Sequence, residues 1–253
     1  MRTIRKQVVP NALTQWRMPR LAANRPGGME CTYAEMRREP DVLAAVEDGL
    51  FREQGGICAY TGQRISLATA SSTLSGQRAV DFHIEHLTPQ AYCAYGQDAD
   101  YANMVACWPR PNCGFEPAYG ARKKGAWPSP QEQHRFVSPL RPDCATHFFF
   151  KRGEIKPVRE SDNAAHETIR RLGLNQATLV DLRKAAIRGA LYPAARPIQL
   201  AEARKLLRRL QRDAAAVDSG EAIQLLPFCF AIQPELERKI RKLEALRHRT
   251  TQP

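Results

Sequence analysis

The chain changes character near residue 160, and this change constrains its fold more than any other feature. Before it, short segments with strand-like alternation are separated by turns, at residues 57–60, 80–86, 103–108 and 148–155. After it, apolar residues recur with helical spacing at residues 164–172, 177–191, 199–212 and 234–247. Strands followed by a run of helices are typical of the α+β class. We therefore predict an α+β fold that is mainly helical.

The first 54 residues contain local helix signals. Residues 1–30 contain three prolines and a Gly-Gly turn, and we predict an arm lying on the body. Thr32 and Glu35 have capping-box spacing for a short helix, and Pro40 suits the first turn of a second helix. The predicted apolar face of that second helix carries Leu43, Val46, Leu50 and Phe51, and Gly55-Gly56 ends it.

Charge is unevenly distributed. The chain has 38 Lys and Arg against 26 Asp and Glu, a net charge of +12, and residues 151–253 hold 21 of the basic residues but only 12 of the acidic ones. At residues 199–212, one helix face is apolar and the rest is largely basic. A concentrated positive field indicates a polyanionic partner, most commonly nucleic acid. The alternative is a solvated basic surface.

No apolar stretch reaches the ~20 residues that a membrane-spanning helix needs. The amino end carries Arg2, Arg5 and Lys6 but no long apolar segment, so we predict a cytoplasmic protein without a secretory signal or a membrane partner. Seven cysteines at irregular spacing favour reduced thiols over a disulfide framework.

Residues 58–125 carry the candidate chemistry. His86 follows Glu85 at the end of a predicted strand, and Asn103 follows later in the chain. A neutral imidazole can take a proton from water, and a carboxylate suits Mg²⁺ or Mn²⁺. We expect His86 to be a general base and Glu85 a metal ligand. Asn103 is expected to accept a hydrogen bond from His86 and fix its tautomer.

Three consecutive basic residues follow this segment, and we expect Arg122, Lys123 and Lys124 to bind phosphate. The alternative is that these three residues only place positive charge at the end of a helix, where it is stabilising. For His83 and His86, the alternative is that the side chain is simply a hydrogen-bonded residue of the core. Because neighbouring residues of a strand point in opposite directions, Glu85 and His86 can share one site only if the strand end is bent.

Several motifs together carry a resemblance to a known family. They are Cys58-Ala59-Tyr60-Thr61-Gly62, His83-Ile84-Glu85-His86-Leu87-Thr88-Pro89, Tyr101-Ala102-Asn103-Met104-Val105-Ala106-Cys107, Cys113-Gly114 and Lys123-Lys124-Gly125, with residues 1–6, 136–140 and 153–155. The chain resembles the PtuB-like HNH endonucleases associated with retron and Septu systems. The resemblance implies an HNH core (ββα-metal, His-Me finger), one divalent cation and cleavage of DNA or RNA in bacterial anti-phage defence. It also implies a PtuA-like ABC-type ATPase as partner and, in retron versions, a reverse transcriptase with its multicopy single-stranded DNA.

By residue, the resemblance implies that His86 is the base, Glu85 the metal ligand and Asn103 the middle member of the motif. The third member departs from the family pattern, because Ala121 stands three places before Lys124 where His or Asn is usual. The metal shell would then be completed by Asn112, if it moves into the site, or otherwise by His83 or by waters.

Many HNH proteins also brace the core with zinc bound by two Cys pairs. Here Thr61 replaces one expected cysteine, so a zinc site of Cys58, Cys107 and Cys113 is incomplete in sequence. Buried reduced cysteines are the alternative.

We predict four regions: an arm with helices at residues 1–54, the HNH core at 55–135, a hairpin with helices at 136–192 that completes the nuclease domain, and a basic helical region at 193–253 that docks a partner. The predicted activity is metal-dependent phosphodiester hydrolysis. The alternatives are a noncatalytic nucleic-acid-binding or ATPase-docking subunit with a degenerate site, and an RNase acting on structured RNA.

Overall fold

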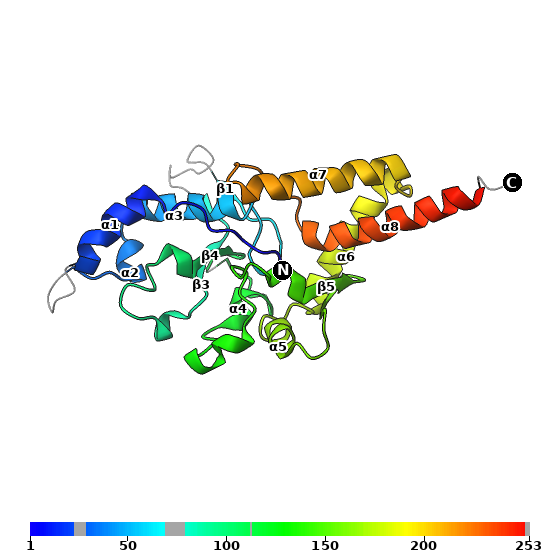
Figure 1. The fold of residues 1–253 in the computed structure, drawn as a ribbon. Coiled ribbons are helices and arrows are strands. Elements are labelled where there is room, and N and C mark those ends of the chain that lie inside the picture. The colour runs from blue at the N-terminus through cyan, green and yellow to red at the C-terminus, as the bar shows by residue number, and fades with distance from the viewer. Residues whose placement is uncertain (23–28, 69–78, 112, 251–253) are drawn as a thin grey trace.

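The structure is a computed structural model that describes residues 1–22, 29–68, 79–111 and 113–250. Its α-helices are α1 (Asn11–Ala22), α2 (Tyr33–Met36), α3 (Pro40–Glu53), α4 (Ala121–Lys124), α5 (Asn163–Arg171), α6 (Ala177–Leu191), α7 (Leu200–Asp218) and α8 (Cys229–Thr250). Its strands are β1 (Leu67–Ala68), β2 (Ala79–Val80), β3 (His83–His86), β4 (Met104–Cys107), β5 (Phe148–Lys151) and β6 (Glu154–Pro157). They pair consecutively in three antiparallel two-stranded sheets (Figure 1). The fold is α+β, as predicted.

The amino-terminal region is more regular than expected. Residues 11–22 form α1 although Pro19 lies inside it, and α1 packs against α3. Leu13 and Trp16 are buried in that contact face. Pro19, together with Pro10 just before the helix, obscures the helical pattern in the sequence, whereas burial of Leu13 and Trp16 favours the helix in the folded chain.

The local signals for α2 and α3 are confirmed. The Thr32 hydroxyl accepts from the Glu35 amide at 3.3 Å, and Pro40 occupies the first turn of α3. Val46 and Leu50 of α3 are fully buried. The helix ends before Gly55, whose φ of +64° lies in the left-handed region that glycine adopts without strain.

The predicted strand at residues 80–86 is broken in two. Asp81 and Phe82 separate β2 from β3, and the Asp81 carboxylate accepts from the Ser66 amide while its carbonyl accepts from the Arg110 amide. Strand β3 then pairs with β4, with His83 opposite Cys107 and His86 opposite Met104. The Gln54 side chain, just after α3, bonds both backbone groups of Ala106 and so anchors β4 to the helix.

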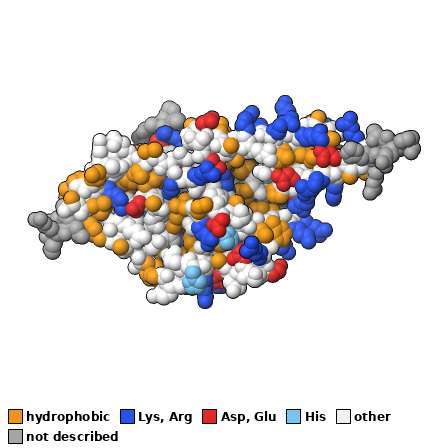
Figure 2. Space-filling model, in the orientation of Figure 1, with side chains coloured by type: hydrophobic (Ala, Val, Ile, Leu, Met, Phe, Trp, Pro, Cys, Tyr) orange, Lys and Arg blue, Asp and Glu red, His pale blue; other side chains and the backbone are white. Residues whose placement is uncertain are grey.

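The carboxyl-terminal helices form a second packing unit. Helices α7 and α8 run in opposite directions against each other, and the end of α8 projects beyond the body (Figure 1). Leu210, Val217, Ile232 and Leu236 form a hydrophobic cluster between them. Lys and Arg side chains gather over the outer surface of both helices (Figure 2). In the described part of the chain, no helix has the length and apolarity that crossing a membrane requires.

Candidate active site

Strand β3 presents two different faces. Exposure alternates along it: Ile84 and His86 are buried, whereas His83 and Glu85 are partly exposed. The pairing with β4 continues regularly through His86, so the strand end is not bent away from its ladder. Glu85 and His86 therefore project to opposite faces, and the expected convergence of these two side chains in one pocket is not what the structure shows.

The face of Glu85 carries a compact group of three charged or titratable side chains. The Lys124 ammonium lies 2.8 Å from Glu85 Oε1, and His83 Nε2 lies 3.9 Å from Glu85 Oε2. Only 1% of the Lys124 side chain and 14% of the Glu85 side chain are exposed. Lys124 comes from α4 and also donates to the His86 carbonyl at 2.9 Å, so the short helix is tied to the strand.

Burial sets the protonation of this group. It raises the pKa of Glu85 above its usual 4.5, although Lys124 opposes the rise. Burial also lowers the pKa of His83 below 6.5, against the bond to Pro109. His83 is therefore neutral at pH 7.

The ring of His83 has a defined tautomer. Its Nδ1 lies 2.5 Å from the Pro109 carbonyl, which can only accept, so Nδ1 carries the proton. The Nε2 lone pair is then free on the side of Glu85. The alternative for His83 was a core residue with its hydrogen bonds satisfied. The structure satisfies one ring nitrogen, Nδ1, and leaves Nε2 free.

His86 has the equivalent arrangement on the other face. Its Nε2 donates to the Asp98 carbonyl at 2.8 Å, and its ring packs edge-on against Tyr33 with centroids 4.6 Å apart. Burial lowers its pKa below 6.5 although the Asp98 bond opposes this, so the ring is neutral at pH 7 with its lone pair on Nδ1. Only 7% of the residue is exposed.

Asn103 holds a loop and does not orient His86. Its Oδ1 accepts from the Thr88 amide at 2.7 Å, and its Nδ2 donates to the carbonyls of Thr88 and Gln97 at 3.1 and 3.3 Å. The expected hydrogen bond from His86 goes to Asp98 instead. Asn103 thus closes the segment between β3 and β4, which carries Asp98 to the His86 ring.

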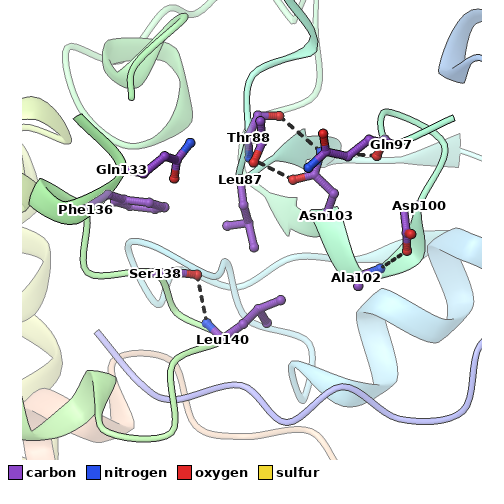
Figure 3. A pocket seen from close by; sticks show the side chains of 10 residues that line it. All are labelled: Leu87, Thr88, Gln97, Asp100, Ala102, Asn103, Gln133, Phe136, Ser138 and Leu140. Atoms are coloured by element: carbon purple, nitrogen blue, oxygen red, sulfur yellow. Dashed lines mark hydrogen bonds between the residues drawn. The ribbon is translucent and has the colours of Figure 1, made fainter. Parts of the chain in front are cut away.

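A pocket of about 370 Å³ lies beside this loop, lined by Leu87, Asn103, Phe136 and Leu140 among others. Figure 3 shows the Asn103 amide pointing to Thr88 and Gln97, with Leu87 and Leu140 facing each other across the opening. Neither Glu85 nor either histidine of β3 lines it. The pocket therefore belongs to the loop and not to the charged face of β3.

The candidate metal-binding atoms on the charged face are Glu85 Oε2 and His83 Nε2, which are 3.9 Å apart. Neighbouring ligands of an octahedral cation bound at about 2.1 Å are about 3.0 Å apart and opposite ligands about 4.2 Å, so the two side chains must move closer to share Mg²⁺ or Mn²⁺ at neighbouring positions. Mg²⁺ and Mn²⁺ accept few protein ligands and keep several waters. Within the described residues no group of three or more His, Cys, Asp and Glu side chains forms a fuller cage. Asn112, the other expected ligand, lies outside the described residues.

The three cysteines expected at a zinc site are not gathered into a three-thiolate group in the described parts of the chain. Cys58 and Cys107 are buried and share a hydrogen bond, whereas Cys113 is exposed and its thiol donates to the Phe115 carbonyl. Burial alone would raise the pKa of Cys58, but hydrogen bonds from Cys107 and Thr61 lower it to about 6.

The three basic residues of α4 differ in their exposure to solvent. Arg122 and Lys123 are exposed, and the Arg122 guanidinium is 4.0 Å from Glu116. Lys124 faces inward, so the expectation that it binds phosphate is corrected: it forms a buried ion pair with Glu85. Its position on the inner face of a four-residue helix explains the difference.

Sequence reasoning missed Tyr33 and Asp98. Tyr33 contacts the His86 ring, and the Asp98 carboxylate accepts from the Tyr33 amide at 2.8 Å while its carbonyl holds the ring. A backbone carbonyl has no side-chain signature, and no motif links Tyr33 to β3. No family model matches the chain, and no curated protein matches it either.

Proposed function

We propose that the protein is a metal-dependent endonuclease that hydrolyses phosphodiester bonds of nucleic acid, with its site at β3 and α4. The observation that carries the proposal is the charged face of β3, where the Glu85 carboxylate meets the Lys124 ammonium and the imidazole of His83. His86 projects to the opposite face, and its assignment as the base rests on the resemblance and on its state: a neutral imidazole with one nitrogen held by a backbone carbonyl and the other free. A general base needs this state to take a proton from water near pH 7. The resemblance to HNH endonucleases assigns the same residue to the same role.

Glu85 and His83 would hold the cation through the Oε2 and Nε2 atoms described above. When bound, Mg²⁺ or Mn²⁺ supplies positive charge that stabilises the leaving 3′ oxygen. Lys124 adds a fixed positive charge on the other carboxylate oxygen, and Arg122 and Lys123 are exposed close by on the same helix for contact with the backbone phosphates.

Cleavage assays on labelled single-stranded DNA, duplex DNA and structured RNA, with Mg²⁺, Mn²⁺ or EDTA, test the proposal. Removing a general base typically lowers the rate by about 10²- to 10⁴-fold, so His86→Ala should lose most activity. His166→Ala is the matched control, because His166 is an exposed histidine on α5 whose ring also bonds a backbone carbonyl. Cleavage by His86→Ala at the wild-type rate would remove His86 from the mechanism.

His83→Ala and Glu85→Gln separate metal binding from proton transfer. Both variants should need a higher cation concentration for half-maximal activity, whereas His86→Ala should not change that concentration. If His83→Ala alone abolishes cleavage at every cation concentration while His86→Ala retains it, His83 is the base.

A noncatalytic nucleic-acid-binding or ATPase-docking subunit is the second candidate, and the divergent directions of Glu85 and His86 favour it. This candidate predicts binding that weakens with salt and no cation-dependent cleavage in any of the assays above. Cleavage confined to structured RNA would instead identify an RNase.

The wider role rests on the resemblance. We place the protein in a bacterial anti-phage defence complex with a PtuA-like ATPase, joined in retron versions by the reverse transcriptase and its multicopy single-stranded DNA. Running the cleavage assays with and without a co-expressed ATPase of this type tests whether the partner changes the activity.

A further inference from the structure

Aromatic side chains gather next to the charged face of β3. Trp108 directly follows β4 and stacks on Tyr119, with ring centroids 6.5 Å apart and planes 18° apart. Phe115 contacts the same Trp108 ring at 5.7 Å. Tyr119 is buried, Trp108 is partly buried and Phe115 is 48% exposed, so the cluster is anchored at one end and open at the other.

This aromatic cluster is joined directly to the candidate site. The Pro109 carbonyl, one residue after Trp108, accepts from His83 Nδ1 at 2.5 Å. The Arg110 amide donates to the Asp81 carbonyl just before β3, which fixes the segment on its other side. The segment that follows Trp108 is therefore tied through its backbone to the strand that carries His83 and Glu85.

The charges around the cluster favour an anion. Arg110, Arg122 and Lys123 are exposed, Arg110 two residues after Trp108 and Arg122 next to Glu116, and the acidic residues in contact with this segment are Glu116 and Asp81. The contact between Arg122 and Glu116 is 4.0 Å long and the Glu116 side chain is 84% exposed, so this pair is weak and leaves the guanidinium available. A solvent-exposed aromatic ring framed by basic side chains is how proteins bind unpaired bases with their phosphates.

We propose that Phe115 and Trp108 form a stacking platform for an unpaired base of a single-stranded nucleic acid, with Arg110, Arg122 and Lys123 on its phosphates. This platform deepens the proposed function, on which it rests for its substrate class. The paired bases of an intact duplex do not offer a free face to the ring.

Fluorescence anisotropy tests the platform by measuring binding of the full chain to labelled 12-nucleotide single strands of DNA and RNA, and to duplexes of the same sequences. EDTA is present, so that binding is measured without cleavage. Loss of a stacked base typically weakens binding by about 5- to 150-fold, and Phe115→Ala should weaken single-strand binding within this range. Phe115→Tyr keeps an aromatic face and should bind within about twofold of the wild type.

Phe149→Ala is the matched control, because Phe149 on β5 is an aromatic residue of similar exposure, 41%. It should leave single-strand binding unchanged. The platform is refuted if Phe115→Ala binds like Phe149→Ala, if duplexes bind as tightly as single strands and respond equally to Phe115→Ala, or if the wild type binds no single strand at low salt. A chain that cleaves but fails this test loses only the platform, and one that binds as expected without cleaving loses only the nuclease assignment.

Discussion

Strand β3 and the pair of helices α7 and α8 both carry ion pairs between segments distant in sequence, but the two regions treat charge differently. Glu85 and Lys124 are almost enclosed, with 14% and 1% of their side chains exposed, whereas Arg204 of α7 and Glu244 of α8 are 48% and 35% exposed. A buried charge depends on its partner, and an exposed one depends mainly on water. The charges at β3 are therefore fixed in place by each other, whereas those of α7 and α8 are largely solvated.

Removing one member of each ion pair should show this difference most strongly. Lys124→Met leaves a buried carboxylate without its partner, so we expect the free energy of unfolding to fall by about 3–5 kcal/mol in urea titrations. Arg204→Gln should cost less than about 1 kcal/mol. Equal costs for the two variants would abolish the distinction between the regions.

The cost of Lys124→Met should also depend on pH. Without the ammonium, the pKa of Glu85 rises further above 4.5, since Lys124 opposes the effect of burial. A protonated carboxyl is cheaper to bury, so the variant should lose less stability at pH 5 than at pH 8. The double variant Glu85→Gln with Lys124→Met should cost less than the sum of its parts.

Asn103→Ala should have the next largest effect. It leaves partly buried backbone groups of Thr88 and Gln97 without their side-chain partner, and we expect the free energy of unfolding to fall by about 1–2 kcal/mol. Ser138→Ala removes a single hydrogen bond to the Leu140 amide on the opposite wall of the same pocket (Figure 3) and should cost less than about 1 kcal/mol. A similar small cost for Asn103→Ala would show that the loop is held by other contacts.

The pH dependence of stability gives a smaller effect on β3. Because burial lowers the pKa of His86 below 6.5, the unfolded chain binds a proton in the range just below pH 6.5 that the folded chain does not. The folded state therefore loses stability as pH falls through that range. His86→Gln should flatten the change in unfolding free energy between pH 7.5 and 5.5, and an unchanged slope would contradict the burial effect.

The smallest effect on stability is expected on the outer surface of α7. Lys205 and Arg208 are exposed, so replacing both with Gln should change the unfolding free energy by less than about 0.5 kcal/mol per site. The same change should weaken nucleic-acid binding and reduce its dependence on salt if the helices contact phosphates. Unchanged salt dependence would limit the nucleic-acid surface to the neighbourhood of β3.

Local signals predicted some elements well. Pro40 and the Gly55-Gly56 pair mark the ends of α3, and Arg152-Gly153, with positive φ at both residues, marks the hairpin of β5 and β6. Helix α8 begins at Cys229, before the predicted start at Pro234, because burial of Ile232 and Leu236 continues the helix across the proline. Tertiary packing decided this boundary, which local propensity could not.

The sequence singled out His83, Glu85 and His86, but it did not predict their contacts. His83 and Glu85 lie on one face because strand residues alternate, which the sequence already indicated. The path of the loop after His86 determines that the Asp98 carbonyl meets the imidazole, and no side-chain pattern encodes that path. Lys124 was expected to bind phosphate or to be helix-end charge, whereas its helix turns it inward to Glu85.

Helix α4 is a single turn of four residues, too short to be helical in isolation. The Lys124 ammonium fastens it to β3 by gripping both a carboxylate and a backbone carbonyl. A proton or a cation that binds the Glu85 carboxylate weakens its ion pair with Lys124 and so weakens the attachment of α4 to β3. Binding of a proton or a cation at Glu85 would therefore also shift α4, and with it the exposed side chains of Arg122 and Lys123 on the same helix.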